Sequence, residues 1–178
     1  MTRRIMTGPR WAAVVAAILL IGGAVYWFAP QTLLYDVTVD ETVPTIEPEE
    51  RDDGEDDPEP DGPSVVAEGE FVTQEHETTG TAQLIRNADG THQIVFHGLD
   101  TSNGPDLRVW LTDQAVDPNE WFVFDDGYHA ELGELKGNKG DQAYPVPDSV
   151  DLDKVSSVSI WCVRFGVSFG AATLVADA

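Results

Sequence analysis

Apolar and polar positions alternate most clearly in the C-terminal stretch SVSIWCVRFGVSFGAATL, residues 157–174. On one side of an extended strand the alternation places Val158, Ile160 and Cys162. On the other side it places Ser159, Trp161, Val163 and Phe165. Because both sides are mostly apolar, we expect a strand that is buried on both faces. Gly166 interrupts the run, and we expect a second strand after it, in which Gly170 permits close packing against a neighbour.

The same alternation recurs in short runs from about residue 69 onward, separated by turn-forming residues. The expected strands are 71–74, 79–87, 91–99, 106–112, 129–135, 141–147, 155–165 and 167–175. Turns are expected at 88–90, 102–105 and 137–141, where Gly, Pro, Asn and Asp gather. No segment here has a sustained helical period, although 116–121 could form a single helical turn. The pattern predicts an all-β fold: an antiparallel β-sandwich or jelly-roll-like domain of about eight strands.

The N-terminal pattern is different, because residues 11–35 contain no charged side chain. Their apolar core is long enough to cross a bilayer, which takes about 20 residues. Arginines precede this segment and acids follow it, which favours an N-terminus inside the cell. We expect a transmembrane signal anchor at 11–30, a single pass through the cell membrane and an extracytoplasmic domain. The alternative is a cleaved signal peptide, for which Ala24 and Ala29 are candidate cleavage-site residues.

The segment between the apolar run and the strands is rich in acids, Pro and Gly. Of the 32 acidic residues, 13 lie between Asp36 and Asp61. Few apolar side chains and many like charges predict a disordered acidic linker at 31–67. Cation capture is the functional alternative, but the acids lack the spacing of an EF-hand loop. The expected organisation is a cytoplasmic N-terminus at 1–10, the anchor at 11–30, this linker, and a β domain at 68–178.

Net charge and cysteine content narrow the function further. The formal net charge is -22, which would repel phosphate, so nucleic acid is excluded as a partner. The single cysteine, Cys162, cannot form a disulfide within one chain.

Cys162 has two interpretations. A free cysteine is usually a small buried hydrophobe, whereas a reactive thiol needs a nearby cation and some exposure. Arg164 is two residues further along the expected strand, on the same face and about 7 Å away, so it is a candidate partner for a thiolate. Because one cysteine cannot form an internal disulfide, redox chemistry would use a sulfenic acid, a mixed disulfide, or a bound metal or haem.

Other polar residues are weaker candidates. The histidines are His76, His92, His97 and His129. His92 and His97 fall on opposite faces of a strand, which argues against a shared metal, so no metal site is predicted. A histidine could still join Cys162 as a haem ligand, although no C-x-x-C-H attachment motif is present.

Acidic, basic and aromatic groups give three further hypotheses. The acid pairs Asp100/Asp106 and Asp125/Asp126 fit turn bracing better than hydrolysis or calcium binding. Lys136 and Lys139 make one loop locally basic and suggest anion capture. Trp110, Trp121 and Trp161 are most simply core or rim aromatics, and Trp121 with Phe122 could instead form an exposed binding edge.

Three blocks taken together resemble the electron-transfer DM13 domain family over residues 69–175. They are GTAQLIRNADGTHQIVFHGLDTSNGPDLRVWLT, ELGELKGNKGDQAYPVP and SVSIWCVRFGVSFGAATL. The arrangement is similar to small bacterial members with an N-terminal membrane anchor. The resemblance implies a β-rich domain in redox reactions outside the cytoplasm, with Cys162 as the family's hallmark cysteine, acting as a bare thiol or a cofactor ligand.

In animal members the domain accompanies a haem-binding DOMON domain, and this sequence shows no such domain. Any second electron carrier is therefore expected to be a separate redox partner protein. The resemblance implies a redox or electron-transfer module rather than a stand-alone enzyme, with haem or no cofactor. The alternative from the residues is a non-catalytic β-sandwich that binds a cell-envelope protein or carbohydrate, in which Cys162 is structural.

Overall fold

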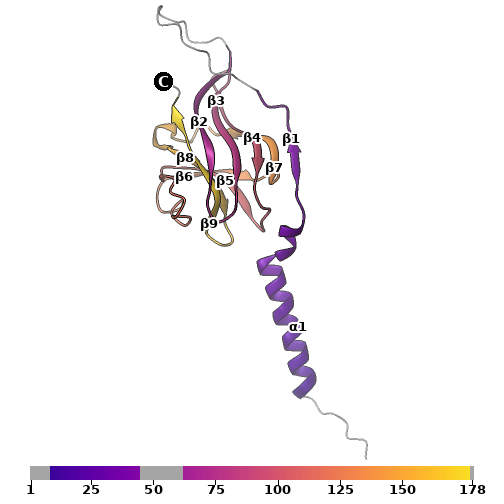
Figure 1. The fold of residues 1–178 in the computed structure, drawn as a ribbon. Helices are drawn as coiled ribbons and strands as arrows, with labels where there is room; N and C mark the ends of the chain where they lie inside the picture. The colour runs from indigo at the N-terminus through magenta and orange to yellow at the C-terminus, as the bar shows by residue number, and fades with distance from the viewer. Residues whose placement is uncertain (1–8, 45–61, 177–178) are drawn as a thin grey trace, which may run out of the picture.

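The computed structural model describes residues 9–44 and 62–176, which form one apolar helix followed by a β domain (Figure 1). The helical elements are α1 (Pro9–Phe28), η1 (Pro30–Leu34) and η2 (Leu152–Lys154). The strands are β1 (Thr38–Asp40), β2 (Ser64–Thr73), β3 (Thr79–Arg86), β4 (His92–Asp100), β5 (Leu107–Thr112), β6 (His129–Glu134), β7 (Lys139–Val146), β8 (Ser157–Cys162), β9 (Val167–Thr173) and β10 (Val175–Ala176).

All eight strands expected from the alternation are present, as β2 to β9, and the all-β prediction is confirmed. The prediction of a two-sheet sandwich or jelly roll is wrong. The described strands instead form one strongly curled mixed sheet, a half-barrel. The strand order is β1-β7-β4-β3-β2-β9-β8-β5-β6, and β10 pairs with β2. Neighbouring strands are antiparallel except β1 and β7, which are parallel.

The curl is centred on β2, which changes its pairing partner along its length. Ser64–Glu70 pair with β3, whereas Phe71–Thr73 pair with β9. Gly69 lies at the change, where an added Cβ would be 1.9 Å from the Thr173 carbonyl oxygen, so only glycine fits. Bulges in the β2–β3, β3–β4, β4–β7, β5–β6 and β8–β9 pairs add local bend and twist. Strand periodicity does not encode such a partner change, which is why it could not separate a curled sheet from a sandwich.

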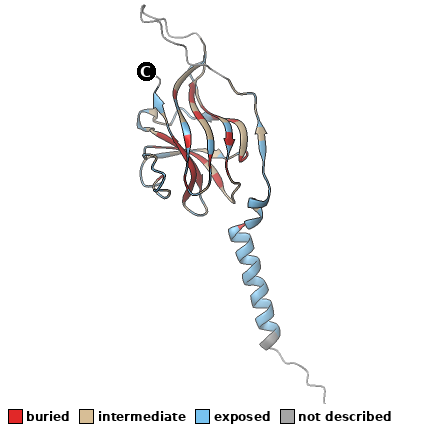
Figure 2. Cartoon of the chain, viewed as in Figure 1, coloured by how far each residue is buried: buried red, intermediate tan, exposed pale blue. Residues whose placement is uncertain are grey.

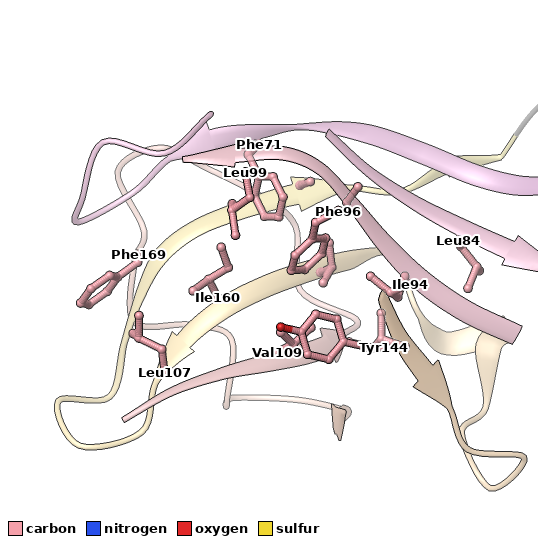
Figure 3. Packing of buried hydrophobic residues seen from close by; sticks show 14 of the residues in the cluster. Phe71, Leu84, Ile94, Phe96, Leu99, Leu107, Val109, Tyr144, Ile160 and Phe169 are labelled. Carbon is pink, nitrogen blue, oxygen red and sulfur yellow. The ribbon is translucent and has the colours of Figure 1, made fainter. Parts of the chain in front are cut away.

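The inner face of the curl holds the main hydrophobic core (Figure 3). Phe96 packs edge-on against Phe71, with ring centroids 5.0 Å apart, and also contacts Tyr144 at 5.6 Å. Ile160 and Cys162 of β8 belong to this core and are fully buried. Val158 belongs to the same core, so the prediction that Val158, Ile160 and Cys162 share one side of the strand is confirmed.

The outer face of β8 is buried as well, which confirms the expectation of a strand covered on both sides. Trp161 points away from the main core and packs in a second cluster with Trp110, Phe124 and Ala171. The segment 113–128 supplies Phe124 and so covers this outer surface. Gly170 allows the close approach that was expected, since an added Cβ would meet the Thr78 side chain at 2.4–2.6 Å.

The expected linker, 31–67, is described only at its two ends, and both ends are ordered. Residues 38–40 form β1 against the edge of β7, and β2 already begins at Ser64. Asn138 holds the segment before β1, because its amide donates to Asp36 and its side-chain oxygen accepts from the Val37 backbone at 2.7 Å. The rest of the predicted linker, 45–61, lies outside the described residues. The first part of this segment therefore joins the domain instead of spacing it from α1.

The helix α1 is exposed from Trp11 to Phe28 (Figure 2). Within the described residues, Trp11–Phe28 is one apolar span long enough to cross a membrane, a property that signal anchors and signal peptides share. The helix ends at Phe28. The next residue, Ala29, has a left-handed φ of 43°, and its backbone N–H donates to the Val25 carbonyl. Pro30 then begins η1.

Candidate functional site

Cys162 is the last residue of β8, at the point where the strand enters its turn to β9. Its backbone is paired with Leu107 of β5 on one side and Val167 of β9 on the other. The side chain is fully buried and belongs to the main hydrophobic core. The thiol therefore lies at one end of the core, directly beneath a turn rather than in the middle of a strand.

The turn, Val163–Gly166, is held to Cys162 by its own backbone. The N–H groups of Phe165 and Gly166 donate to the Cys162 carbonyl at 3.2 and 2.8 Å. Gly166 has a φ of 61°, a left-handed conformation that favours glycine. The Val163 N–H donates to the Asp106 carbonyl at 3.0 Å, which ties the turn to the start of β5. These bonds make the turn a closed cover over the end of β8.

The environment of the sulfur raises the pKa of Cys162 above its ordinary value of 9.0, because burial disfavours the charged thiolate. Backbone N–H groups of Phe165, Arg164 and Asp106 act in the opposite direction, since they stabilise a thiolate. Burial is the larger of these effects, so the closed conformation keeps the thiol protonated at neutral pH. A thiol that stays protonated is a poor nucleophile, because the thiolate is the reactive form.

Arg164 lies in the turn and not on the strand, because β8 ends at Cys162. Its guanidinium donates to the carbonyls of Tyr26 and Trp27 in the last turn of α1, at 3.2 and 2.9 Å. It also lies 5.9 Å from the centre of the Trp27 ring. The Arg164 backbone amide contributes to the environment of the sulfur, while its side chain binds the helix. A role for Arg164 as a thiolate partner stays a prediction.

A haem or metal held by Cys162, as the family resemblance implied, does not fit this conformation. The sulfur is enclosed by core side chains and has no exposed surface for a ligand bond. Leu107 and Val167, the residues paired with Cys162 on either side, belong to the same buried cluster. Among the described residues, no three His, Cys, Asp or Glu side chains group as a metal site.

The predicted histidines lie apart in different settings. His76 pairs with Glu75 and lies over the Phe169 ring, with ring centroids 4.0 Å apart. His97 is hydrogen-bonded to Gln83 at 3.1 Å. His129 stacks on Trp110 at 4.4 Å. His92 is the first residue of β4.

The remaining charged candidates take part in ion pairs. Asp100 binds Lys139 at 2.6 Å. Asp106 binds Arg108 at 2.8 Å. Lys136 binds Glu41 at 2.7 Å, so both lysines of the basic loop already face carboxylates. In the structure these residues stabilise the fold through ion pairs, and neither lysine is a partner of Cys162.

The remaining predicted residues, Trp121, Phe122, Asp125 and Asp126, belong to the segment 113–128. Trp121 is partly buried, and its carbonyl accepts the Ser168 N–H at 2.8 Å, two residues after the turn. Phe122 beside it is exposed, as the binding-edge hypothesis required. Asp125 and Asp126 lie in the segment that covers the outer face of β8.

Sequence reasoning missed two features of the site. One is the set of turn amides around the sulfur, for which Gly166 was the available signal. The other is the contact between this turn and α1, which joins residues more than 130 positions apart and leaves no mark in local patterning.

These observations define a class of protein. It has an apolar helix followed by a β domain, with one buried cysteine at the end of a central strand. The model of the electron transfer DM13 family matches residues 70–174. The chain therefore belongs to the electron-transfer DM13 family, which confirms the resemblance carried by the three sequence blocks. Comparison with curated proteins gave no match. Comparison with solved structures also gave no match.

Proposed function

We propose that this chain is a single-pass membrane protein that carries an electron-transfer module outside the cytoplasm. The observation that carries the proposal is the family match over residues 70–174. The apolar span of α1 supports an anchor, and the basic residues before it with the acids after it support an N-terminus inside.

The contacts between α1 and the domain argue against cleavage after Ala29, one of the two candidate cleavage-site residues. Arg164 and Phe165 bind the end of α1, and cleavage after Ala29 would remove their partners. The segment Trp27-Phe28-Ala29 also lacks the small residue that a signal peptidase site has two positions earlier.

Cys162 is the redox group in this proposal, and it acts when the β8–β9 turn opens. In the open state the thiol loses its proton and attacks one sulfur of a disulfide in a separate partner protein. A bond forms between Cys162 and that sulfur, the partner's other sulfur leaves as a thiolate, and the electron pair of the old S–S bond goes with it. A thiol of a separate reductant then attacks the partner sulfur of this mixed disulfide. The Cys162–sulfur bond breaks, Cys162 leaves as a thiolate in its reduced form, and the reductant is left in a disulfide with the partner.

The test uses the full chain in phosphatidylcholine nanodiscs and an aromatic disulfide reagent that releases a coloured thiolate. We expect one equivalent of colour per chain, released more slowly than from denatured protein but faster than global unfolding. A Cys162→Ala variant gives no release and is the control. Release only at the rate of global unfolding would overturn the role of Cys162, because the turn would then not open on its own.

The second candidate is a binding module of the cell envelope in which Cys162 only fills space. Its full burial in the core favours this reading. In that case Cys162→Ala costs roughly 1–2 kcal/mol of stability and leaves cellular function intact at equal abundance. Loss of a cellular redox phenotype in a well-folded Cys162→Ala strain would decide for electron transfer.

A further inference from the structure

We infer that the β8–β9 turn, Val163–Gly166, lies in the lipid headgroup layer of the bilayer that α1 crosses. The proposal rests on the anchoring part of the proposed function. It adds that the domain lies against the membrane through this turn, with the Cys162 end facing the lipid.

The depth of the turn follows from the length of the helix. Trp11–Phe28 is 18 residues long, and at about 1.5 Å per residue it spans about 27 Å, close to the roughly 30 Å hydrocarbon core. Phe28 therefore lies at the outer boundary of that core. The Phe165 ring stacks on Phe28 with ring centroids 5.9 Å apart, so it lies at nearly the same depth.

Arg164 joins the turn to the helix end by polar contacts suited to this layer. The Tyr26 and Trp27 carbonyls are in the last helical turn and have no partner further along the helix. Arg164 donates to both carbonyls, so neither depends on water where the helix leaves the hydrocarbon. Its charge also complements the negative end of the helix dipole. The Tyr and Trp side chains are the aromatic types that favour the interface.

The turn presents apolar side chains where water would otherwise be. Val163 and Phe165 are 44% and 39% exposed even with α1 in place. Leu33, Leu34 and Tyr35 of the segment after α1 are exposed as well and follow directly from the membrane span. Lipid is the occupant that fits, because this apolar surface is continuous with the end of a membrane-spanning helix. With a net charge of -22 the chain is repelled by anionic headgroups, so docking depends on apolar contact with uncharged lipid.

One consequence concerns Cys162, the residue immediately before the turn. If the turn lies among headgroups, a partner reaches this sulfur from the membrane side. The redox partner is then a membrane protein or another protein that works at the membrane surface.

The experiment places a polarity-sensitive fluorophore on the full chain, reconstituted in phosphatidylcholine nanodiscs. The labelled position is Phe165→Cys in a Cys162→Ala background, with Val163→Cys as a second position in case the first label perturbs the turn. The control is Val175→Cys, which is 63% exposed in β10, near the end of the chain marked away from α1 in Figure 1. We expect a blue-shifted emission and loss of signal with spin-labelled lipid at 163 and 165, and neither at 175.

The outcomes separate the two proposals. If the chain stays in the membrane pellet after alkaline carbonate but the labels at 163 and 165 behave like the label at 175, the docking inference is overturned and the anchor stands. If the chain is extracted, or mass spectrometry shows that α1 has been removed, the anchor fails and the docking inference fails with it.

Discussion

The Phe165 ring stacks on the Phe28 ring, with centroids 5.9 Å apart and an angle of 25° between the planes. This pair joins the β8–β9 turn to the last residue of α1. Cys162 immediately precedes the turn, so the lone thiol lies at the end of the domain from which the helix leaves. The end of the helix contacts the turn, and the turn directly follows the thiol. A substitution in any one of the three should therefore have a measurable effect on the other two.

The first prediction concerns Arg164, whose guanidinium binds the Tyr26 and Trp27 carbonyls. We expect Arg164→Ala to loosen the turn against α1. The loss of about 1 kcal/mol would raise amide hydrogen exchange at 163–166 about 5-fold. Lys154→Ala is the control, because it removes an ion pair with Asp151 inside its own helical turn. Equal exchange at 163–166 in the wild type and Arg164→Ala would show that the contact does not hold the turn.

The second prediction uses Gly166 to test whether opening of the turn exposes Cys162. A Cβ at Gly166 would meet only the Trp161 ring at 4.0 Å, so Gly166→Ala adds backbone strain without a clash. The left-handed φ costs about 1–2 kcal/mol for alanine, which predicts about 5- to 30-fold faster thiol labelling.

The matched control for Gly166→Ala is Gly90→Ala, in the β3–β4 hairpin turn. Gly90 has a φ of 82° and no neighbour within 4 Å of an added Cβ, so the backbone strain is similar and only its place differs. Labelling that rises equally in both variants would mean that Cys162 is reached by global destabilisation rather than by this turn.

The third prediction is the pH profile of thiol labelling. Burial raises the pKa of Cys162 above 9.0 in the closed state, so ionisation is easier in the open state. The population of the open form with an ionised Cys162 therefore keeps rising about tenfold per pH unit, even at pH values where a free thiol is already fully ionised. We expect iodoacetamide labelling of folded protein to keep rising above pH 9, whereas denatured protein levels off. A folded profile that levels off at or below pH 9 would contradict the raised pKa.

Much of the β domain could be predicted from the alternation of side chains, because each strand needs only local periodicity. Ile160 and Trp161 show this, since they were assigned to opposite faces of a doubly buried strand and lie in separate clusters. The curled sheet could not be predicted, because it depends on β2 leaving β3 for β9 after Glu70. That change is a property of pairing between distant segments and not of either sequence alone.

The candidate site was predicted in identity but not in geometry. Cys162 stood out as the only cysteine in an apolar strand, and its burial follows from that pattern. Arg164 was expected on the same strand face, but the strand ends at Cys162 itself. Gly166 marked the turn, yet where a turn begins within a run of apolar residues depends on the tertiary pairing of β8 with β9.

The last prediction tests the ordered segment at the start of the expected linker. Glu41 follows β1. Its carboxylate accepts hydrogen bonds from the Lys136 side chain and another, of 2.9 Å, from the Ala143 backbone N–H. The Lys136 hydrogen bond, more than any other contact, lowers the pKa of Glu41 below its ordinary value of 4.5. A carboxylate with a lowered pKa stabilises the docked segment above that ordinary value, and the contribution is lost as the pH falls through the lowered pKa.

We therefore expect Glu41→Gln to raise hydrogen exchange in β1, at 38–40, about 2- to 5-fold at neutral pH, since an exposed ion pair contributes at most about 1 kcal/mol. Wild-type β1 should approach the same exchange level in acid, after correction for the intrinsic rate. Asp40→Asn is the control, because it removes the neighbouring charge while the bond between Glu41 and Lys136 stays. Equal effects of the two substitutions would indicate that net charge, and not this contact, holds β1 against β7.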